Sequence, residues 1–70
     1  MGGGEVEERV RRALKELGAA TFEDLLLAIS WEGDLRPLRR VIARMVREGV
    51  LTEEPDYSRR KLVYKLSGDP

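Results

Sequence analysis

The side chains best suited to chemistry in this sequence are arginines gathered in one short segment. From Asp34 to Glu48 the chain carries five arginines, and the two residues that bound the segment are its only acids. A guanidinium is a planar, permanently charged fork of donors that pairs with a phosphate, a carboxylate or the O6/N7 edge of guanine. Recognition of an anion is therefore the chemistry that this segment favours. The arginines are Arg36, Arg39, Arg40, Arg44 and Arg47.

The spacing predicts a helix from Leu35 to Glu48 that gathers these arginines on one side. At ~100° per residue they fall within an arc of about 140°, which only Ala43 shares. Asp34 is expected to cap this helix and Gly49 to end it, with Asp34 and Glu48 both off the arginine side. The opposite side is apolar and predicts core packing for Leu35, Leu38, Val41, Ile42, Met45 and Val46.

Composition excludes most other chemistry. The sequence contains no Cys, His, Asn or Gln, so it offers no thiol nucleophile, imidazole base or histidine-ligated or cysteine-ligated metal. Where two acidic residues are consecutive in the sequence, their side chains point apart on a helix or strand and cannot act as a pair on one substrate. We therefore expect no enzyme, no metal site, no cofactor and no small-molecule ligand. Because Asn and Gln are the usual partners of adenine, base reading is limited to guanine or to the shape of the duplex.

The 70 residues suffice for one small domain, and its charge is unevenly placed. Thirteen Lys and Arg balance thirteen Asp and Glu, which gives a formal net charge of zero. Residues 1–33 hold four basic and seven acidic residues, whereas residues 34–50 hold five and two. The neutral total thus conceals an acidic first half and a basic segment in the middle.

Two helices are predicted ahead of the arginine segment. Residues 1–4 are expected to form a flexible leader, and whether Gly2–Gly4 are native residues is left open. An apolar stripe at helical spacing predicts a helix from Glu5 to Leu17. Residues 19–21 form a short extended link and a candidate strand. Thr21 and Asp24 match a capping box that starts a helix from Phe22 to Ile29.

After Gly49 the pattern changes to the period of a strand. Residues 50–52 and 61–66 predict two strands of a hairpin with a long tip over 53–60, and residues 67–70 a tail. On the second strand Leu62, Tyr64 and Leu66 alternate with Lys61, Val63 and Lys65, and Tyr64 is expected on the inner face. The predicted fold class is α+β, with three helices, a C-terminal β-hairpin and the candidate third strand.

This order resembles a winged helix-turn-helix over residues 5–66. The stretch REGVLTEEPDYSRRKLVYKLS is similar to the helix end, turn, Arg-Arg pair and returning strand of MarR-like regulators. The resemblance implies a third helix in the DNA major groove and wing arginines, here Arg59 and Arg60, in the neighbouring minor groove. With Lys61 beside them, these hairpin residues are expected to touch the DNA backbone or minor groove. MarR-like regulators carry flanking helices for dimerisation and ligand binding that have no counterpart here, so a ligand-sensing role is not implied.

Each candidate contact has a plainer alternative. The arginine side meets double-stranded DNA, an acidic protein surface in a transcription, replication or other assembly, or only solvent and the acidic first helix. Trp31 packs against the core or anchors a partner, and Tyr57 contacts a sugar or covers the hairpin. A regulator built from so short a module is expected to form a homodimer.

The remaining expectations concern source and location. No apolar run approaches the ~18 residues of a membrane span, and the N-terminus lacks the pattern of a signal peptide, so a cytoplasmic protein without membrane contact is expected, nucleoid-associated if it binds DNA. A chain rich in Glu and Arg but free of Asn, Gln and Cys is typical of a thermophilic, archaeal-like source.

Overall fold

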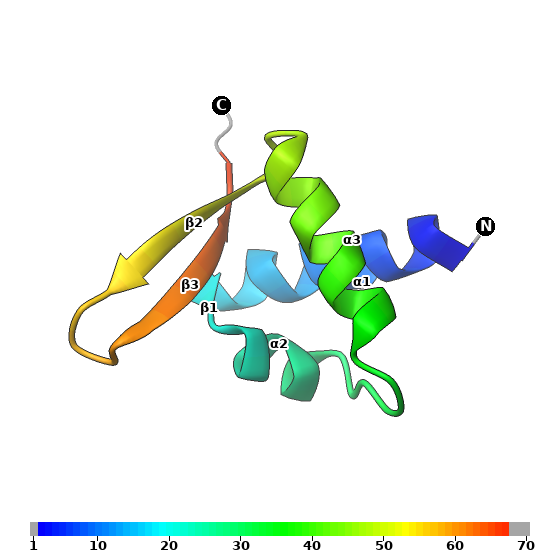
Figure 1. Cartoon of the computed structure of the whole chain (residues 1–70), viewed down its shortest axis with the longest axis horizontal. Helices are drawn as coiled ribbons and strands as arrows, with labels where there is room; N and C mark the ends of the chain where they lie inside the picture. Colours follow the sequence, from blue (N-terminus) through cyan, green and yellow to red (C-terminus); the bar gives the residue numbers. More distant parts are fainter. Residues whose placement is uncertain (1, 68–70) are drawn as a thin grey trace.

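The computed structural model describes residues 2–67 and contains three helices and a three-stranded antiparallel sheet. This confirms the predicted small α+β class. The predictions for Met1 and for residues 68–70 lie outside the described residues. In chain order the elements are α1 (Gly2–Leu17), β1 (Ala19–Ala20), α2 (Phe22–Ala28), α3 (Arg36–Arg47), β2 (Leu51–Asp56) and β3 (Lys61–Leu66) (Figure 1).

The first helix is longer than predicted at its N-terminal end. α1 begins at Gly2, three residues before the predicted start at Glu5, so the glycines expected in a leader continue the helix. Extending an existing helix costs far less than nucleating one, and residues of the first turn have no intrahelical acceptor for their N–H groups in any case. Gly18, at a φ of 82°, ends α1 in the left-handed conformation that glycine adopts readily.

The capping box predicted for the second helix is present. The backbone N–H of Asp24 donates to Thr21 Oγ1, and the backbone N–H of Thr21 donates to Asp24 Oδ2, each at 3.1 Å. α2 has only seven residues, too few to be stable alone. These two bonds and the burial of Leu25 therefore hold it in place.

The start of α3 differs from the prediction. Leu35 occupies the N-cap position, and its side chain caps nothing. Asp34 precedes it, and its Oδ1 accepts a hydrogen bond from the backbone N–H of Arg36 at 3.0 Å. Asp34 thus satisfies one free amide from outside the helix. The helix ends at Arg47, with Glu48 as its C-cap and Gly49 beyond it at a φ of 81°.

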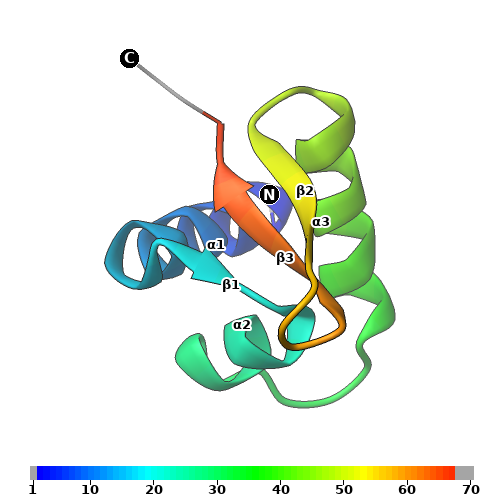
Figure 2. The same cartoon turned by 90° about the vertical axis from the view of Figure 1, so that its left-hand side faces the viewer.

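The sheet has the order β1-β3-β2, which confirms the candidate third strand. Ala19 pairs with Lys65, and the hairpin register runs from Leu51 opposite Leu66 to Asp56 opposite Lys61. The hairpin tip is thus only residues 57–60, and the prediction of a tip over 53–60 was wrong. Pro55 lies within β2, which is possible because β2 is an edge strand, and the N–H groups along its unpaired edge have no neighbouring strand to bond. Figure 2 shows the three strands side by side.

One core joins the three helices to the sheet. Its fully buried side chains come from every layer. The prediction for β3 was partly wrong. Tyr64 and Leu66 pack partly buried against the core as expected, but Leu62 is half exposed and Val63, on the other face, is buried. Leu62 is the second residue of β3 and adjoins the hairpin tip, which projects beyond the helices (Figure 1). The fully buried large side chains are Val10, Leu14, Leu25, Leu38, Met45 and Leu51.

Candidate nucleic-acid interface

The outer side of α3 carries all five of its arginines. Each is exposed, as is Ala43 between them, while Leu38, Val41, Ile42 and Met45 are buried on the opposite side. The helical period predicted this separation, because a short amphipathic helix must turn its apolar stripe to the core. The prediction of core packing was wrong for Leu35, which precedes the helix and is exposed. We call this surface the arginine face: Arg36, Arg39, Arg40, Ala43, Arg44 and Arg47.

The arginine face is partly engaged by other elements. Arg44 lies 3.5 Å from Glu7 Oε1 of α1, and Glu7 Oε2 lies 3.2 Å from Arg11. One carboxylate therefore joins the two helices. This is the contact with the acidic first helix that the plainest alternative described, and it applies to Arg44. The Glu7 side chain is 22% exposed, so water screens the pair only in part.

Arg36 is held at the start of the helix. Its guanidinium forms a two-pronged contact with the Asp34 carboxylate, with the closest N–O distance 2.8 Å. The Arg36 side chain and its backbone N–H lower the pKa of Asp34, and burial opposes them. The prediction that Asp34 lies off the arginine side was wrong, because a residue just before a helix folds back onto the first turn.

Arg39 occupies a groove between α3 and the hairpin. Its guanidinium carbon lies 4.5 Å from the centre of the Phe22 ring, a cation–π contact. Ala43, Glu53 and Tyr64 line the same groove, whose volume is about 270 Å³. The pKa of Tyr64 is raised, mainly by burial of the hydroxyl and to a lesser degree by the nearby Glu53 carboxylate. The hydroxyl is therefore a neutral hydrogen-bond donor at neutral pH.

Arg40 and Arg47 form no ion pair within residues 2–67. Both lie near the centre of the arginine face. At ~100° per residue, Arg39 and Arg44 mark the two edges of this face, and Arg40 and Arg47 fall between them. With Arg44, Pro37 and Val41 they line an open hollow of about 370 Å³. These two guanidinium groups are the part of α3 most available to an anion.

The cations of the hairpin, like the arginines of α3, include some that form ion pairs and one that does not. Arg59 lies 3.3 Å from Asp24, and Lys61 lies 3.5 Å from Glu23, so two hairpin cations contact the first turn of α2. The Thr21 amide lowers the pKa of Asp24, burial opposes this, and Arg59 lowers it further. Arg60 has no ion pair in the described part of the chain and adopts a φ of 58°.

The two aromatic candidates differ. Trp31 packs partly buried against the core, and its Nε1 donates to the Asp34 carbonyl at 3.0 Å. This geometry favours the packing alternative. Tyr57 is 84% exposed, so it does not cover the hairpin.

Sequence reasoning missed four residues that position these cations: Glu7, Phe22, Glu23 and Asp24. Glu23 and Asp24 were identifiable as acids in the first turn of a helix, where the dipole favours them. Their pairing with the hairpin was not, because Asp24 and Arg59 are 35 residues apart.

Within residues 2–67, no group of three or more acids is placed to hold a metal ion. In the same part of the chain, none of the helices has both the length and the apolar character that crossing a membrane requires. Comparison of the chain with models of protein families, with curated proteins and with solved structures found no match.

Proposed function

We propose that this chain is a winged-helix DNA-binding protein, a small transcriptional regulator or chromatin-associated factor. α3 enters the major groove, and the hairpin is the wing that touches the backbone or minor groove. The observation that carries the proposal is the centre of the arginine face, where Arg40, Ala43 and Arg47 are exposed together and neither arginine forms an ion pair within residues 2–67.

The architecture supports the proposal. The order helix, strand, helix, helix, strand, strand, with the first strand paired with the last, is compatible with a winged helix. An α-helix is the element that fits the width of the major groove. Because this fold also serves in assemblies without DNA, the surface of α3 has to carry the functional argument.

The charges indicate modest affinity. Arg40 and Arg47 meet phosphates without losing an earlier partner, whereas Arg44 and Lys61 exchange a carboxylate for a phosphate. Each phosphate neutralised releases counterions, so binding weakens as salt rises. A net charge of zero gives little long-range attraction. We therefore expect short-range binding with weak sequence preference, which a homodimer would strengthen by covering two half-sites.

A titration with duplex DNA tests the function. Amide and arginine side-chain NMR signals of the ¹⁵N-labelled protein are followed with a duplex of about 16 base pairs, at about 50 mM and about 200 mM salt. We expect salt-sensitive shifts at Arg40 and Arg47, and little change at the exposed residues of α1 such as Arg9. Absence of shifts on α3 at the lower salt would contradict the proposal.

A further inference from the structure

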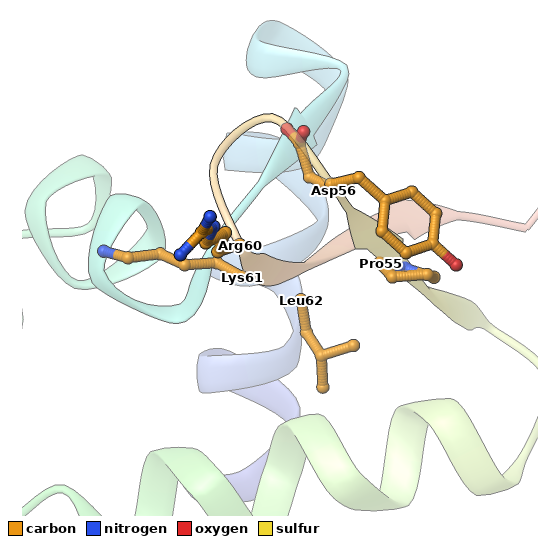
Figure 3. A pocket seen from close by; sticks show the side chains of 6 residues that line it. Pro55, Asp56, Arg60, Lys61 and Leu62 are labelled. Atoms are coloured by element: carbon orange, nitrogen blue, oxygen red, sulfur yellow. The ribbon is translucent and has the colours of Figure 1, made fainter.

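The hairpin tip exposes apolar side chains that the core does not use. Tyr57 is 84% exposed, Leu62 is 50% exposed and Pro55 is also exposed. Together with Asp56, Arg60 and Lys61 they line a shallow, open hollow of about 450 Å³ (Figure 3). We call Pro55, Tyr57 and Leu62 the tip patch. Large apolar side chains that are exposed together on a small domain are typical of a contact surface for a partner.

The turn that presents the tip patch is fixed by hydrogen bonds. Asp56 Oδ1 accepts the backbone N–H groups of Ser58 and Arg59 at 3.1 and 3.3 Å, and the Asp56 carbonyl accepts that of Arg60 at 2.7 Å. A partner would therefore lose little entropy in ordering this surface.

The charged residues that line the hollow are Asp56, Arg60 and Lys61, two cations against one anion. The Asp56 carboxylate keeps its charge while it accepts the hydrogen bonds of the turn, and Glu54 nearby pairs with Lys65 at 3.1 Å. Arg60 has no ion pair among residues 2–67 and lies in Figure 3 to one side of Leu62, with Pro55 on the other. The hollow thus combines an apolar floor with one available guanidinium at its edge.

We propose that the tip patch binds a protein partner that presents an apolar side chain next to a carboxylate. The apolar side chain fills the hollow against Tyr57 and Leu62, and the carboxylate pairs with Arg60. A polyanion would satisfy Arg60 but leave most of this hollow without apolar contact. The tip patch is separate from α3 but shares Arg60 with the proposed wing contact. A partner at the tip would therefore compete with DNA for the wing, whereas DNA binding through α3 can hold or fail independently of this site.

Selection from a displayed library of random peptides of about twelve residues tests this proposal. The folded protein is the target, and the selected peptides are then titrated against variants. We expect them to share a Leu, Ile or Phe next to Asp or Glu. The variant Tyr57→Ser/Leu62→Ser is expected to weaken binding by at least about tenfold and Arg60→Ser by about threefold or more.

Matched variants keep the result interpretable. Leu27→Ser also removes a leucine that is 80% exposed, but on α2, and is expected to bind the peptides like the wild type. Tyr57→Ser alone serves if the double variant does not fold by circular dichroism. Equal binding by all variants, or a selection without an acidic and apolar pair, would overturn the proposal. The proposal would also be overturned if duplex DNA shifted the NMR signals of Tyr57 and Leu62 and none of the selected peptides shifted them.

Discussion

The guanidinium carbon of Arg39 lies 4.5 Å from the centre of the Phe22 ring, so the first residue of α2 and the first turns of α3 are held together by a cation–π contact. Arg39 also lines the groove between α3 and the hairpin, together with Glu53 and Tyr64. Its position therefore depends on the packing of three elements, whereas Arg40 and Arg47 form no ion pair within residues 2–67.

Replacing Arg39 with methionine should test that contact. Arg39→Met keeps an aliphatic side chain over the ring but removes the charge, and we expect a loss of about 0.5–1 kcal/mol in the free energy of unfolding. Arg47→Met, which removes a charge that contacts no ring, should stay within about 0.5 kcal/mol of the wild type. Urea unfolding measures both, and equal losses would contradict the stabilising role of the stack.

Two leucines of α2 should differ sharply in importance. Leu25 is fully buried and Leu27 is 80% exposed, although they are two residues apart on one helix. Leu25→Ala removes core contacts and leaves a cavity, so it should cost about 2–5 kcal/mol. Leu27→Ala should change stability by about 0.5 kcal/mol or less. Similar urea midpoints for the two variants would show that α2 packs with another face inward.

Stability should fall in acid because of Asp24. The Thr21 amide, with help from Arg59, lowers the pKa of this carboxyl below its ordinary 3.8 in the folded state. The ionised form therefore stabilises folding above about pH 4, and this contribution disappears as the pH falls through the lower folded pKa. The lowered pKa of Asp34 acts in the same direction.

The test is the unfolding free energy of wild type and Asp24→Asn from about pH 6 to about pH 2. The variant should have a lower unfolding free energy than the wild type at about pH 6 and should lose less of it on acidification. The loss that remains in the variant is expected to come from Asp34. Parallel curves for the two proteins would contradict the assignment to Asp24.

Releasing Lys61 should favour DNA. Glu23 lies 3.5 Å from Lys61, and both side chains are more than half exposed, so Glu23→Gln should alter stability by less than about 1 kcal/mol. The variant removes a negative charge beside the hairpin and frees a cation, so we expect tighter DNA binding by about two- to fivefold. Glu8→Gln makes the same charge change next to Arg12 on α1. An equal gain from both variants would show a net-charge effect only.

The sequence predicted those features that depend on local periodicity. The apolar and arginine sides of α3 follow from its helical repeat, and the capping box follows from Thr21 and Asp24 three residues apart. The extent of β2 was missed because Pro55 suggests a turn, and only its place on an edge strand makes it compatible with the sheet.

The partners of the cations were beyond prediction for a different reason. Glu7 and Arg44, or Glu23 and Lys61, meet only after α1, α2 and the hairpin pack together. Periodicity indicates which side of an element a charge occupies, but not which neighbouring element supplies the opposite charge. The sequence therefore located the arginine face correctly and overstated how many of its members are available.

The most direct test of DNA binding through α3 compares two charge reversals. Arg40→Glu/Arg47→Glu changes the centre of the arginine face, and Arg9→Glu/Lys15→Glu makes the same change in net charge on exposed positions of α1. Fluorescence anisotropy with one labelled duplex at about 50 mM salt gives the affinities, and urea unfolding checks the fold. We predict a loss of at least about tenfold for the α3 variant and about threefold or less for the α1 variant. Equal losses, or unchanged binding by the folded α3 variant, would contradict the proposal.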